Sequence, residues 1–500
     1  MSTGTALSLA LYFIAMLGIG LYAYRTSTND VSGYLLGGRK LGPAVTALSA
    51  GASDMSGWMV MGLPGALYLG GVSQSWMGVG LVLGAYANYW VVATRLRVYT
   101  EVANDAITLP DFFEHRFEDH SRLLRIVASL VIILFFTVYT SSGVVGGGKL
   151  FESAFNLPYS LGLYITAGVV VIYTLFGGFL AVSLTDFVQG CIMFTALILV
   201  PVVALSEVDG TTGLISTVKN IDPARLDFMA GTSLLAIVSS LAWGLGYFGQ
   251  PHIIVRFMAI RSIKDIKVAR RIGMSWMMVS LIGAMATGFI GMAYVAKTGV
   301  VLEDAETIFI LLSQLLFHPL IAGFLLAAVL AAIMSTISSQ LLVTSSSLTE
   351  DIYKAFLKKK ASQQELVAVG RACVVIVALV AVVLAHNRNS SVLQIVSHAW
   401  AGFGAAFGPM ILLSLYWKRM TAAGALAGML VGAATVLFWV YAPLTIAGLP
   451  LSQTVYEIIP GALLSTVAIL MVSKQTAPPS ASVQATFDVM EKTVEARLKD

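Results

Sequence analysis

Charged residues are scarce in this chain, since Asp, Glu, Lys and Arg together make up only 11% of its 500 residues. An ordinary soluble domain carries about 25% charged residues. The charges present here are too few to coat the surface of a water-soluble fold of this size. The shortage excludes a soluble enzyme, a disordered chain and a nucleic-acid-binding protein.

Cysteines and catalytic motifs are also in short supply. The two cysteines, Cys191 and Cys373, both lie in apolar runs, so we expect no disulfide framework. The sequence contains no Walker-type Gly-Lys-Ser/Thr, which excludes ATP as an energy source. The six histidines show no metal-ligand spacing, and no nucleophile–base pair stands out. We therefore expect neither enzyme activity nor an organic cofactor.

Apolar residues, by contrast, make up 57% of the chain and gather in long runs. A bilayer core about 30 Å thick requires about 20 apolar residues of helix. Because the runs lack the alternation of a membrane barrel, we interpret them as helices. The sequence predicts an all-α integral membrane protein with thirteen spans, at 6–24, 42–69, 73–94, 124–148, 158–177, 186–206, 231–256, 272–296, 317–346, 367–385, 391–417, 421–441 and 457–473.

Positive charges predict the orientation of these spans, because Lys and Arg gather on the cytoplasmic side. An N-terminus outside and a C-terminus inside place 25 of the 30 Lys and Arg residues on the inner side. The five that remain outside are Lys149, Lys219, Arg225, Lys297 and Arg388. We interpret the inner clusters at 256–271 and 358–360 as topology anchors, with contact to anionic lipids as the second reading.

Two spans carry residues that interrupt a helix. Glycine gathers with Ser, Asp and Trp at 50–58, and with Trp, Tyr, Gln and Pro at 242–251. Interrupted helices at corresponding positions of two repeats are typical of secondary transporters. The alternative is that these glycines only permit close helix packing, which is our interpretation of Gly80 and Gly84.

The two interruptions lie five spans apart, so their spans have opposite orientations. This predicts two inverted repeats of five spans each, at 41–206 and 231–417, within one transmembrane domain at 1–473. Residues 1–25 and 420–473 would form three peripheral helices, and 474–500 a cytoplasmic tail. Residues 303–316 predict an amphipathic helix on the outer face, where it would act as a gate.

Asp54 lies near the middle of the second predicted span. A carboxylate at that depth costs a few kcal/mol on insertion scales, which makes it a functional candidate. No Lys or Arg stands at helical spacing from it, so a bound cation is a natural partner. The alternative is a protonated, structural Asp that bonds the broken backbone.

The ninth predicted span places several hard oxygen atoms on one patch. The hydroxyls of Ser335 and Thr336 lie one turn after the carbonyl of Ala332. Hard oxygens suit Na⁺, although such hydroxyls often bond back to their own helix. Unwound carbonyls at Ala52 and Met55 could complete the shell of a Na⁺ ion.

At these residues the chain resembles the sodium/solute symporter family and, within it, the bacterial proline-transporting branch. The resemblance covers nearly the whole chain and is weakest after about residue 474. It is carried by Leu35–Arg39, 46–66, Gly177–Ser183, Trp243–His252, 326–353 and Ala399–Pro409.

The resemblance implies the inverted-repeat fold first recognised in the bacterial leucine transporter. It implies Na⁺-coupled uptake of L-proline by alternating access, in a multi-pass protein of the bacterial inner membrane. A monomer would suffice for transport, while the oligomeric state stays open. Rival hypotheses are a symporter for another small solute (another amino acid, pantothenate or a sugar) and coupling to H⁺ through Asp54.

The resemblance also implies roles for individual residues. Na⁺ would be held by Ala52, Met55, Ala332, Ser335 and Thr336, with Asp54 needed for coupling. Ser56, Gly57, Tyr139, Trp243 and Tyr247 would lie at or beside the proline site, and Arg39 and Asp186 would act in gating or coupling. The chain departs from the family pattern at Ser339, where a cysteine is expected, and this residue is grouped with the gating positions.

The chemistry of proline fits these positions. Its carboxylate can accept from free N–H groups near Ser56 and Gly57, where the dipole of the resumed helix is positive. Its ring needs an apolar wall, which Trp58, Trp243 and Tyr247 could provide, and its ammonium could lie on an aromatic face. The alternative for these aromatic residues is packing between helices.

Overall fold

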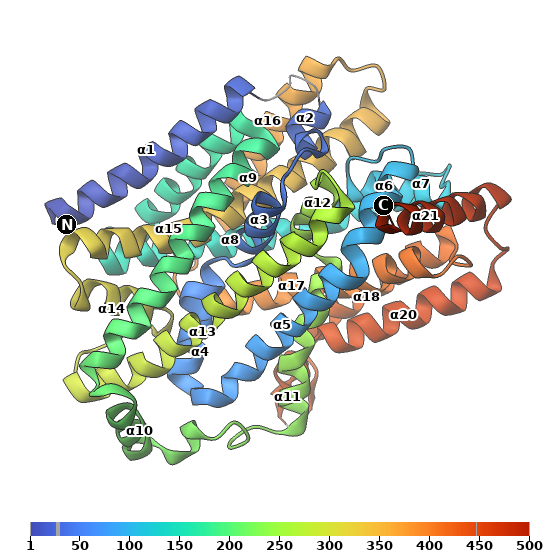
Figure 1. The fold of residues 1–500 in the computed structure, drawn as a ribbon. Helices are drawn as coiled ribbons and strands as arrows, with labels where there is room; N and C mark the ends of the chain where they lie inside the picture. The colour runs from blue at the N-terminus through green and yellow to red at the C-terminus, as the bar shows by residue number, and fades with distance from the viewer. Residues whose placement is uncertain (1, 27–30, 447, 500) are drawn as a thin grey trace.

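Long apolar helices dominate the computed structural model, which describes residues 2–26, 31–446 and 448–499 (Figure 1). Ten stretches of the described chain are long and apolar enough to cross a membrane. They are α1 (Thr3–Thr26), Trp58–Val102, α8 (Leu123–Phe155), Gly178–Glu207, Ile263–Thr298, Pro319–Leu357, α16 (Gln363–Leu384), α17 (Val392–Tyr416), α18 (Ala422–Tyr441) and α20 (Ile458–Gln475).

Every predicted apolar run lies on helix, but three of them are divided or shortened. The second run is split into α3 (Pro43–Asp54) and the pair η2 (Trp58–Gly62) and α4 (Leu63–Gly70). The seventh is split into α11 (Leu234–Leu241), η6 (Ala242–Gly249) and α12 (Pro251–Ala259). The fifth is the first arm of α9 (Tyr159–Glu207). The pieces η2 and α4 continue into the long stretch at 58–102. The other pieces are each shorter than the roughly 20 residues that a bilayer requires.

The connection between the fifth and sixth runs differs from the prediction, which left a loop at 178–185. Helix α9 continues through these residues and turns at Gly178, whose φ of 56° and ψ of −152° lie outside the helical region. A Cβ at Gly178 would lie 2.6 Å from a ring carbon of Tyr34. Because only glycine allows this turn, the loop shrinks to one residue and the sixth span begins earlier than predicted.

Three long stretches contain further elements. The stretch at 58–102 continues from α4 through η3 (Gly71–Gln74), α5 (Ser75–Asn88), η4 (Tyr89–Ala93) and α6 (Thr94–Val102). Helix α13 (Ile266–Thr298) follows η7 (Ile263–Asp265), and α15 (Pro319–Ser346) continues into η9 (Ser347–Leu357).

The remaining short elements lie at the two ends of the bundle. The end that holds the N-terminus carries α10 (Gly210–Ile221) and α14 (Ile308–Leu316) (Figure 1). Helix α14 and η8 (Ala305–Thr307) confirm the helix predicted at 303–316. The opposite end carries α2 (Val31–Leu36), α7 (Leu109–Phe117) and α21 (Ala481–Lys499). A two-stranded hairpin, β1 (Thr445–Ile446) and β2 (Leu449–Pro450), and α19 (Leu451–Thr454) join α18 to α20.

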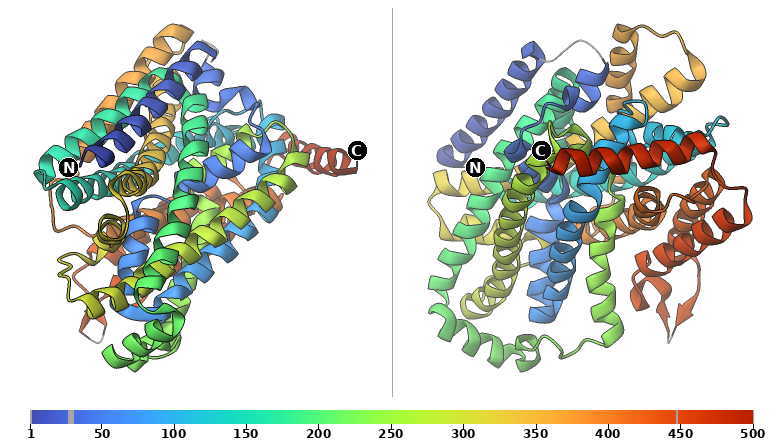
Figure 2. Two further views of the ribbon diagram at one scale, coloured as in Figure 1. Left: turned by 60° about the vertical axis from the view of Figure 1, so that its left-hand side comes forward. Right: turned by 45° about the vertical axis from the view of Figure 1, so that its right-hand side comes forward.

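Helix α21 lies within the stretch 474–500 that was predicted to form a tail, and it is docked on the bundle. It runs crosswise to the long helices (Figure 2). Its Phe487 side chain is only 3% exposed and packs edge-on against Tyr99 of α6. Arg497 of α21 lies 2.7 Å from Glu101.

Helix α15 lies at the centre of the fold and packs against α1, α3, α8 and α9. In its most apolar window 83% of the residues are buried, compared with 28% in α1. On the other side of the molecule, α5 packs closely on η6. A Cβ at Gly84 would lie 2.2 Å from the Gly244 carbonyl oxygen, and one at Gly80 would lie 2.4 Å from that of Leu241. This confirms the packing interpretation of the two α5 glycines.

Candidate functional site

The helix of the second span is broken directly after Asp54. Met55, with ψ at 78°, leaves the helical region. The Ser56 N–H donates to the carbonyl of Asp54 at 2.9 Å, and helix resumes by Trp58. The predicted interruption is confirmed, and it turns backbone groups of this segment away from the helical ladder.

The seventh span is broken at Gln250, which is extended with φ −83° and ψ 107°. Proline disfavours helical geometry in the residue before it and is well suited to the first position of a helix. Pro251 therefore ends the tight helix η6 and begins α12. The two predicted interruptions are both present.

A cluster of buried oxygen atoms joins the first break to α15. The Ser335 hydroxyl oxygen lies 2.7 Å from the Ala52 carbonyl oxygen and 3.2 Å from that of Ala332. The Thr336 hydroxyl oxygen lies 3.5 Å and 3.3 Å from the same two carbonyl oxygens. Met55 follows one residue beyond the end of α3. The structure thus brings together four of the five residues predicted to hold Na⁺ and places the fifth at the break.

The spacing of this oxygen cluster fits a small cation. Oxygen ligands of Ca²⁺ lie at about 2.3–2.6 Å, so neighbouring ligands in a six-fold shell are about 3.3–3.7 Å apart. Na⁺ is close to Ca²⁺ in size. Three of the four oxygen–oxygen distances given above are 3.2–3.5 Å. A modest outward movement of Ser335 from Ala52 would bring the set to the geometry of a cation shell.

Asp54 connects the two breaks. Its side chain is 1% exposed, and the Tyr247 hydroxyl of η6 donates a short hydrogen bond to its Oδ2. Its main-chain carbonyl accepts from Trp58 Nε1 at 2.9 Å and from the Tyr139 hydroxyl at 3.4 Å. Oδ1 has no hydrogen-bond partner within the described ranges. One carboxylate oxygen is therefore fixed by the second break, and the other is free to bind.

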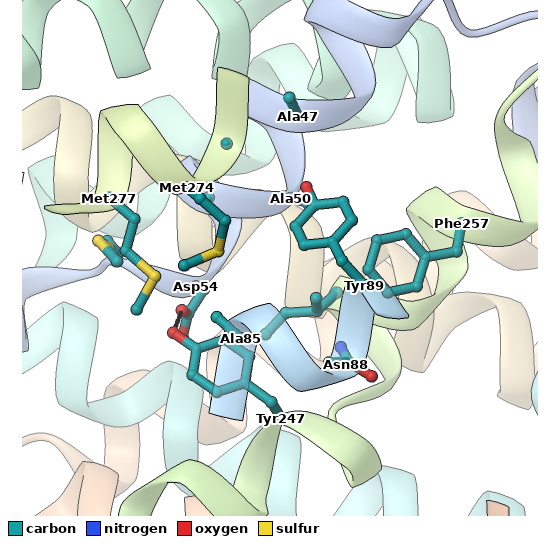
Figure 3. A pocket seen from close by; sticks show the side chains of 14 residues that line it. Ala47, Ala50, Asp54, Ala85, Asn88, Tyr89, Tyr247, Phe257, Met274 and Met277 are labelled. Atoms are coloured by element: carbon teal, nitrogen blue, oxygen red, sulfur yellow. Dashed lines mark hydrogen bonds between the residues drawn. The ribbon is translucent and has the colours of Figure 1, made fainter. Parts of the chain in front are cut away.

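A small cavity of about 30 Å³ lies beside this carboxylate (Figure 3). Asp54 and Tyr247 meet at its edge, with Met274 and Met277 on one side and Tyr89 and Phe257 on the other. The cavity has the size of about one to two water molecules. Of the predicted substrate residues, Tyr247 lines it, and Ser56, Gly57, Trp58, Tyr139 and Trp243 do not.

The aromatic residues of η6 belong to a larger stack. Trp243 lies parallel to Tyr456 at 5.2 Å and to Trp400 at 6.5 Å. Tyr247 meets Trp400 edge-on at 5.1 Å, and Trp400 Nε1 donates to the Trp243 carbonyl at 2.8 Å. Sequence reasoning missed Trp400, although it lies in the stretch 399–409 that carries the family resemblance. It also missed Tyr456, for which no motif gave a signal.

A second buried polar cluster links four helices. Asp186 of α9 accepts from Arg256 of α12 at 3.0 Å and from Ser49 of α3 at 2.7 Å, through the same oxygen Oδ2. Ser339 of α15 accepts from Arg256 at 2.6 Å and lies 3.4 Å from Asp186. The structure thus joins the predicted positions Asp186 and Ser339. Sequence reasoning placed Arg256 among the topology anchors and missed its pairing, although an unpaired Asp at the start of an apolar run called for a partner.

Arg39 lies apart from both clusters, at the end of the bundle opposite the N-terminus. Its guanidinium pairs with Asp105 at 2.9 Å and donates to the carbonyls of Met258 and Ala106, each at 2.7 Å. It also donates to Thr100 at 3.2 Å. Arg39 therefore ties the segment before α3 to the ends of α6 and α12.

Comparison of the sequence with known proteins gives one family and many close relatives. The family described as the sodium:solute symporter family matches residues 34–432. An osmoregulated proline transporter of Bacillus subtilis is 59% identical over 99% of this chain and 100% of that protein. A high-affinity proline transporter of the same organism is 57% identical over 96% and 100%. A sodium/proline symporter of Staphylococcus saprophyticus is 54% identical over 98% and 96%.

Comparison of the fold finds similar solved structures at much lower sequence identity. A Na⁺-coupled sialic acid symporter in a substrate-bound, outward-open state matches with a TM-score of 0.81, 20% identity, and 96% and 99% of the two chains. A nucleobase-cation-symport-1 family transporter in a closed conformation matches with a TM-score of 0.57, 14% identity, and 92% and 98% of the two chains. Both likenesses concern the fold alone.

Proposed function

The chain belongs to the sodium:solute symporter family, and we propose that it couples the uptake of L-proline to Na⁺ across a bacterial plasma membrane. The observation that carries the proposal is the oxygen cluster between the broken helix and α15. Its Ala52 lies two residues before Asp54, whose buried carboxylate is bonded to Tyr247 of the second broken span. The names of the proline-transporting relatives supply the substrate.

In this proposal Na⁺ lies between α3 and α15. The carbonyls of Ala52, Met55 and Ala332 and the hydroxyls of Ser335 and Thr336 would form its shell. Support comes from the four residues that already share hydrogen bonds at 2.7–3.5 Å. A cation here would pin the first break against the central helix, and would thereby favour one of the two states of an alternating-access cycle.

Proline would lie between the two breaks. The N–H groups near Ser56 and Gly57 would bind its carboxylate at the start of the resumed helix. The Ser56 N–H would exchange its bond to the Asp54 carbonyl for one to the substrate. Tyr139 and Tyr247 would stand beside it, because each donates to an oxygen of Asp54. Trp243 would bound the pocket through the stack with Trp400. Trp58 would hold the break in shape, since its indole N–H is committed to Asp54.

The proposed arrangement in the membrane has thirteen spans, with the N-terminus outside and α21 in the cytoplasm. Residues 41–206 and 231–417 would be the inverted repeats, 1–25 and 420–473 the peripheral helices, and 474–500 the tail. Helix α14 would then lie at the outer face. Arg39 would act at the inner face, and Asp186 with Ser339 would link the halves, in gating or coupling. A monomer would suffice for transport.

The driving force suffices for strong accumulation. Moving one charge through about 100 mV yields about 2.3 kcal/mol, and a tenfold Na⁺ gradient adds about 1.4 kcal/mol. Together they support roughly 500-fold accumulation at one Na⁺ per substrate.

Uptake of radiolabelled proline into proteoliposomes tests the proposal. Uptake is measured with an inward Na⁺ gradient, and then with choline in place of Na⁺ at the same pH. We expect uptake only with Na⁺. Equal uptake in both buffers would favour H⁺ coupling through Asp54. No uptake in either buffer would indicate that the transporter carries another small solute with Na⁺. A competition screen would then identify that solute.

A further inference from the structure

Two polar side chains at the second break lack hydrogen-bond partners. His252 is 0% exposed, and neither of its ring nitrogens is bonded within the described part of the chain. Gln250 is also 0% exposed, and its Oε1 has no partner among the described residues. A buried polar atom without a partner is destabilising, because it has lost its hydrogen bonds to water and has gained none in the protein. These atoms therefore indicate a ligand.

Gln250 contacts α17 and His252 contacts α8, two helices that pack on each other. Gln250 Nε2 donates to the Trp400 carbonyl of α17 at 3.1 Å. The His252 ring meets the edge of Phe136 of α8 at 5.3 Å, and Phe136 in turn packs on Phe403 of α17 at 4.4 Å. The unpartnered atoms therefore belong to one region of the interior.

This region adjoins the proposed substrate site. The His252 ring stands perpendicular to Tyr139, with 5.9 Å between ring centroids. The Tyr139 hydroxyl donates to Asp54 at the first break. The Trp400 ring meets Tyr247, which donates to the same Asp54. His252 is thus one aromatic residue away from the main-chain carbonyl of Asp54, and Gln250 is connected to the Asp54 carboxylate through Trp400 and Tyr247.

The position of His252 is fixed on several sides. Two aromatic rings hold the imidazole, and its own carbonyl accepts from Arg256 Nη1 at 2.7 Å. Arg256 is anchored in turn by Asp186. A polar group that is already held in place by packing loses little entropy when it binds a ligand. This favours a role for His252 in binding over one in packing alone.

The hydrogen-bonding groups of proline include an ammonium for which no acceptor has yet been assigned. A secondary ammonium has two N–H donors, and the backbone N–H groups near Ser56 and Gly57 can serve only the carboxylate. A neutral imidazole carries one lone pair, and an amide oxygen accepts. His252 and Gln250 together supply two acceptors.

We propose that Gln250 Oε1 and one ring nitrogen of His252 accept the two N–H groups of the substrate's secondary ammonium. This inference rests on the proposed function and names the residues that recognise the substrate's amine by hydrogen bonds. Two acceptors suit an amine with two hydrogens. They would leave one acceptor unused by N-methylproline, whose tertiary ammonium has a single N–H.

Equilibrium binding of radiolabelled L-proline to the purified full-length protein, in saturating Na⁺, tests the proposal. Hydrogen bonds to charged groups are among the stronger ones in proteins. We expect His252→Phe and Gln250→Leu each to weaken proline binding about 10-fold or more. The Na⁺ concentration for half-maximal binding at saturating proline should change by less than about twofold. His252→Gln, which keeps an acceptor, should recover part of the affinity.

Competition by N-methylproline measures the preference of the protein for proline. That preference would not change in the variants if Gln250 and His252 had only a structural role. The unaltered protein should prefer proline, and both His252→Phe and Gln250→Leu should lose most of that preference. Thr174→Val is the matched control, because Thr174 is likewise 0% exposed with an unpartnered hydroxyl but lies on α9. It should leave both affinities unchanged.

The outcomes separate this inference from the proposed function. Failure of the unaltered protein to bind proline would overturn the proposed function. If it binds proline and the variants bind within twofold of it, or keep the preference for proline over N-methylproline, the role of Gln250 and His252 is overturned. If His252→Phe does not fold, Gln250→Leu and His252→Gln decide by the same preference.

Discussion

The guanidinium of Arg256 lies 3.0 Å from Asp186 Oδ2, and neither side chain is exposed to any extent. The pair joins α12, the second half of one broken helix, to α9. Ser49 of α3 and Ser339 of α15 bond to it from two further helices. A buried ion pair that fixes four helices in one arrangement acts as a structural register between the two proposed repeats.

Removal of one partner of this ion pair should destabilise the protein strongly. Asp186→Asn leaves a buried guanidinium without its counter-charge, at a cost of about 3–5 kcal/mol. The double variant Asp186→Asn/Arg256→Gln removes both charges and should recover much of the loss. Thermal unfolding in detergent measures both effects.

The exposed pair Arg261–Asp265 provides the control for this prediction. Its atoms approach to 2.6 Å, but the Arg261 side chain is 60% exposed. Arg261→Gln should therefore change stability by less than about 1 kcal/mol. Our interpretation would be contradicted if the destabilisation of the double variant equalled the sum for Asp186→Asn and Arg256→Gln measured singly.

Asp54→Asn should keep the fold and weaken Na⁺-dependent binding. The substitution preserves size, but it removes the negative charge two residues after Ala52, whose carbonyl belongs to the oxygen cluster. The half-saturating Na⁺ concentration for proline binding should therefore rise. Tyr247→Phe is the companion variant, because it removes the hydrogen bond to Oδ2 and keeps the charge. It should shift the Na⁺ requirement less. Unchanged Na⁺ dependence in Asp54→Asn would remove this residue from coupling.

Thr336→Val should raise the Na⁺ requirement more than it alters substrate selectivity. The substitution deletes a hydroxyl that lies 3.3–3.5 Å from two carbonyl oxygens of the proposed shell and changes little else. Thr344→Val on the same helix is the control, since that hydroxyl bonds back to the Gln340 carbonyl at 2.8 Å within its own helix. Na⁺ titrations of uptake in proteoliposomes distinguish the two. Altered selectivity with an unchanged Na⁺ requirement would assign Thr336 to the substrate site.

The sequence predicted the features that depend on local chemistry. Apolar runs indicated the spans, and Pro251 with its neighbouring glycines indicated the second break. The spacing of Ala332, Ser335 and Thr336 placed three oxygens on one face of a helix, which the structure joins to Ala52.

Features that depend on contacts distant in sequence were missed. Nothing near Arg256 reveals that it meets Asp186, 70 residues away. Tyr456 lies outside both proposed repeats and yet stacks on Trp243. The turn at Gly178 was missed for a different reason, because a single glycine with positive φ leaves no gap in an apolar pattern.

His115 should make α7 more stable at low pH. Its Nδ1 lies 3.2 Å from Asp111 Oδ1, and the hydrogen bond to Asp111 raises the pKa of His115 above its ordinary value. A raised pKa in the folded protein contributes stability that is complete below the pKa of the unfolded chain, about 6.5, and is lost as the pH rises through the folded value. The unfolding midpoint of His115→Gln should therefore lie below that of the unaltered protein at pH 6 and approach it by pH 8.5. The opposite trend would contradict the assignment.

Helix α21 is docked by an ion pair and by the burial of an aromatic side chain. Salt weakens the ion pair but not the burial, so its concentration distinguishes the two contributions. Lys418–Asp488 at 2.6 Å joins partly exposed side chains, about 40% exposed on each side. Such a pair is worth about 0–1 kcal/mol and is screened by salt. Phe487 is buried against Tyr99 and lies under the Arg116 guanidinium, 5.3 Å from the ring centre.

Proteolysis of the linker at 476–480 in inside-out vesicles, over a range of KCl concentrations, should show which force holds α21. Asp488→Lys should expose the linker at low salt, because it opposes Lys418, and the exchange Lys418→Asp/Asp488→Lys should restore protection. Phe487→Ala, which costs about 3–5 kcal/mol when the aromatic ring is buried, should expose the linker at every salt concentration. Two results together would show that charge rather than burial holds this helix. Asp488→Lys would expose the linker as fully as Phe487→Ala does, and high KCl would expose the linker of the unaltered protein to the same extent.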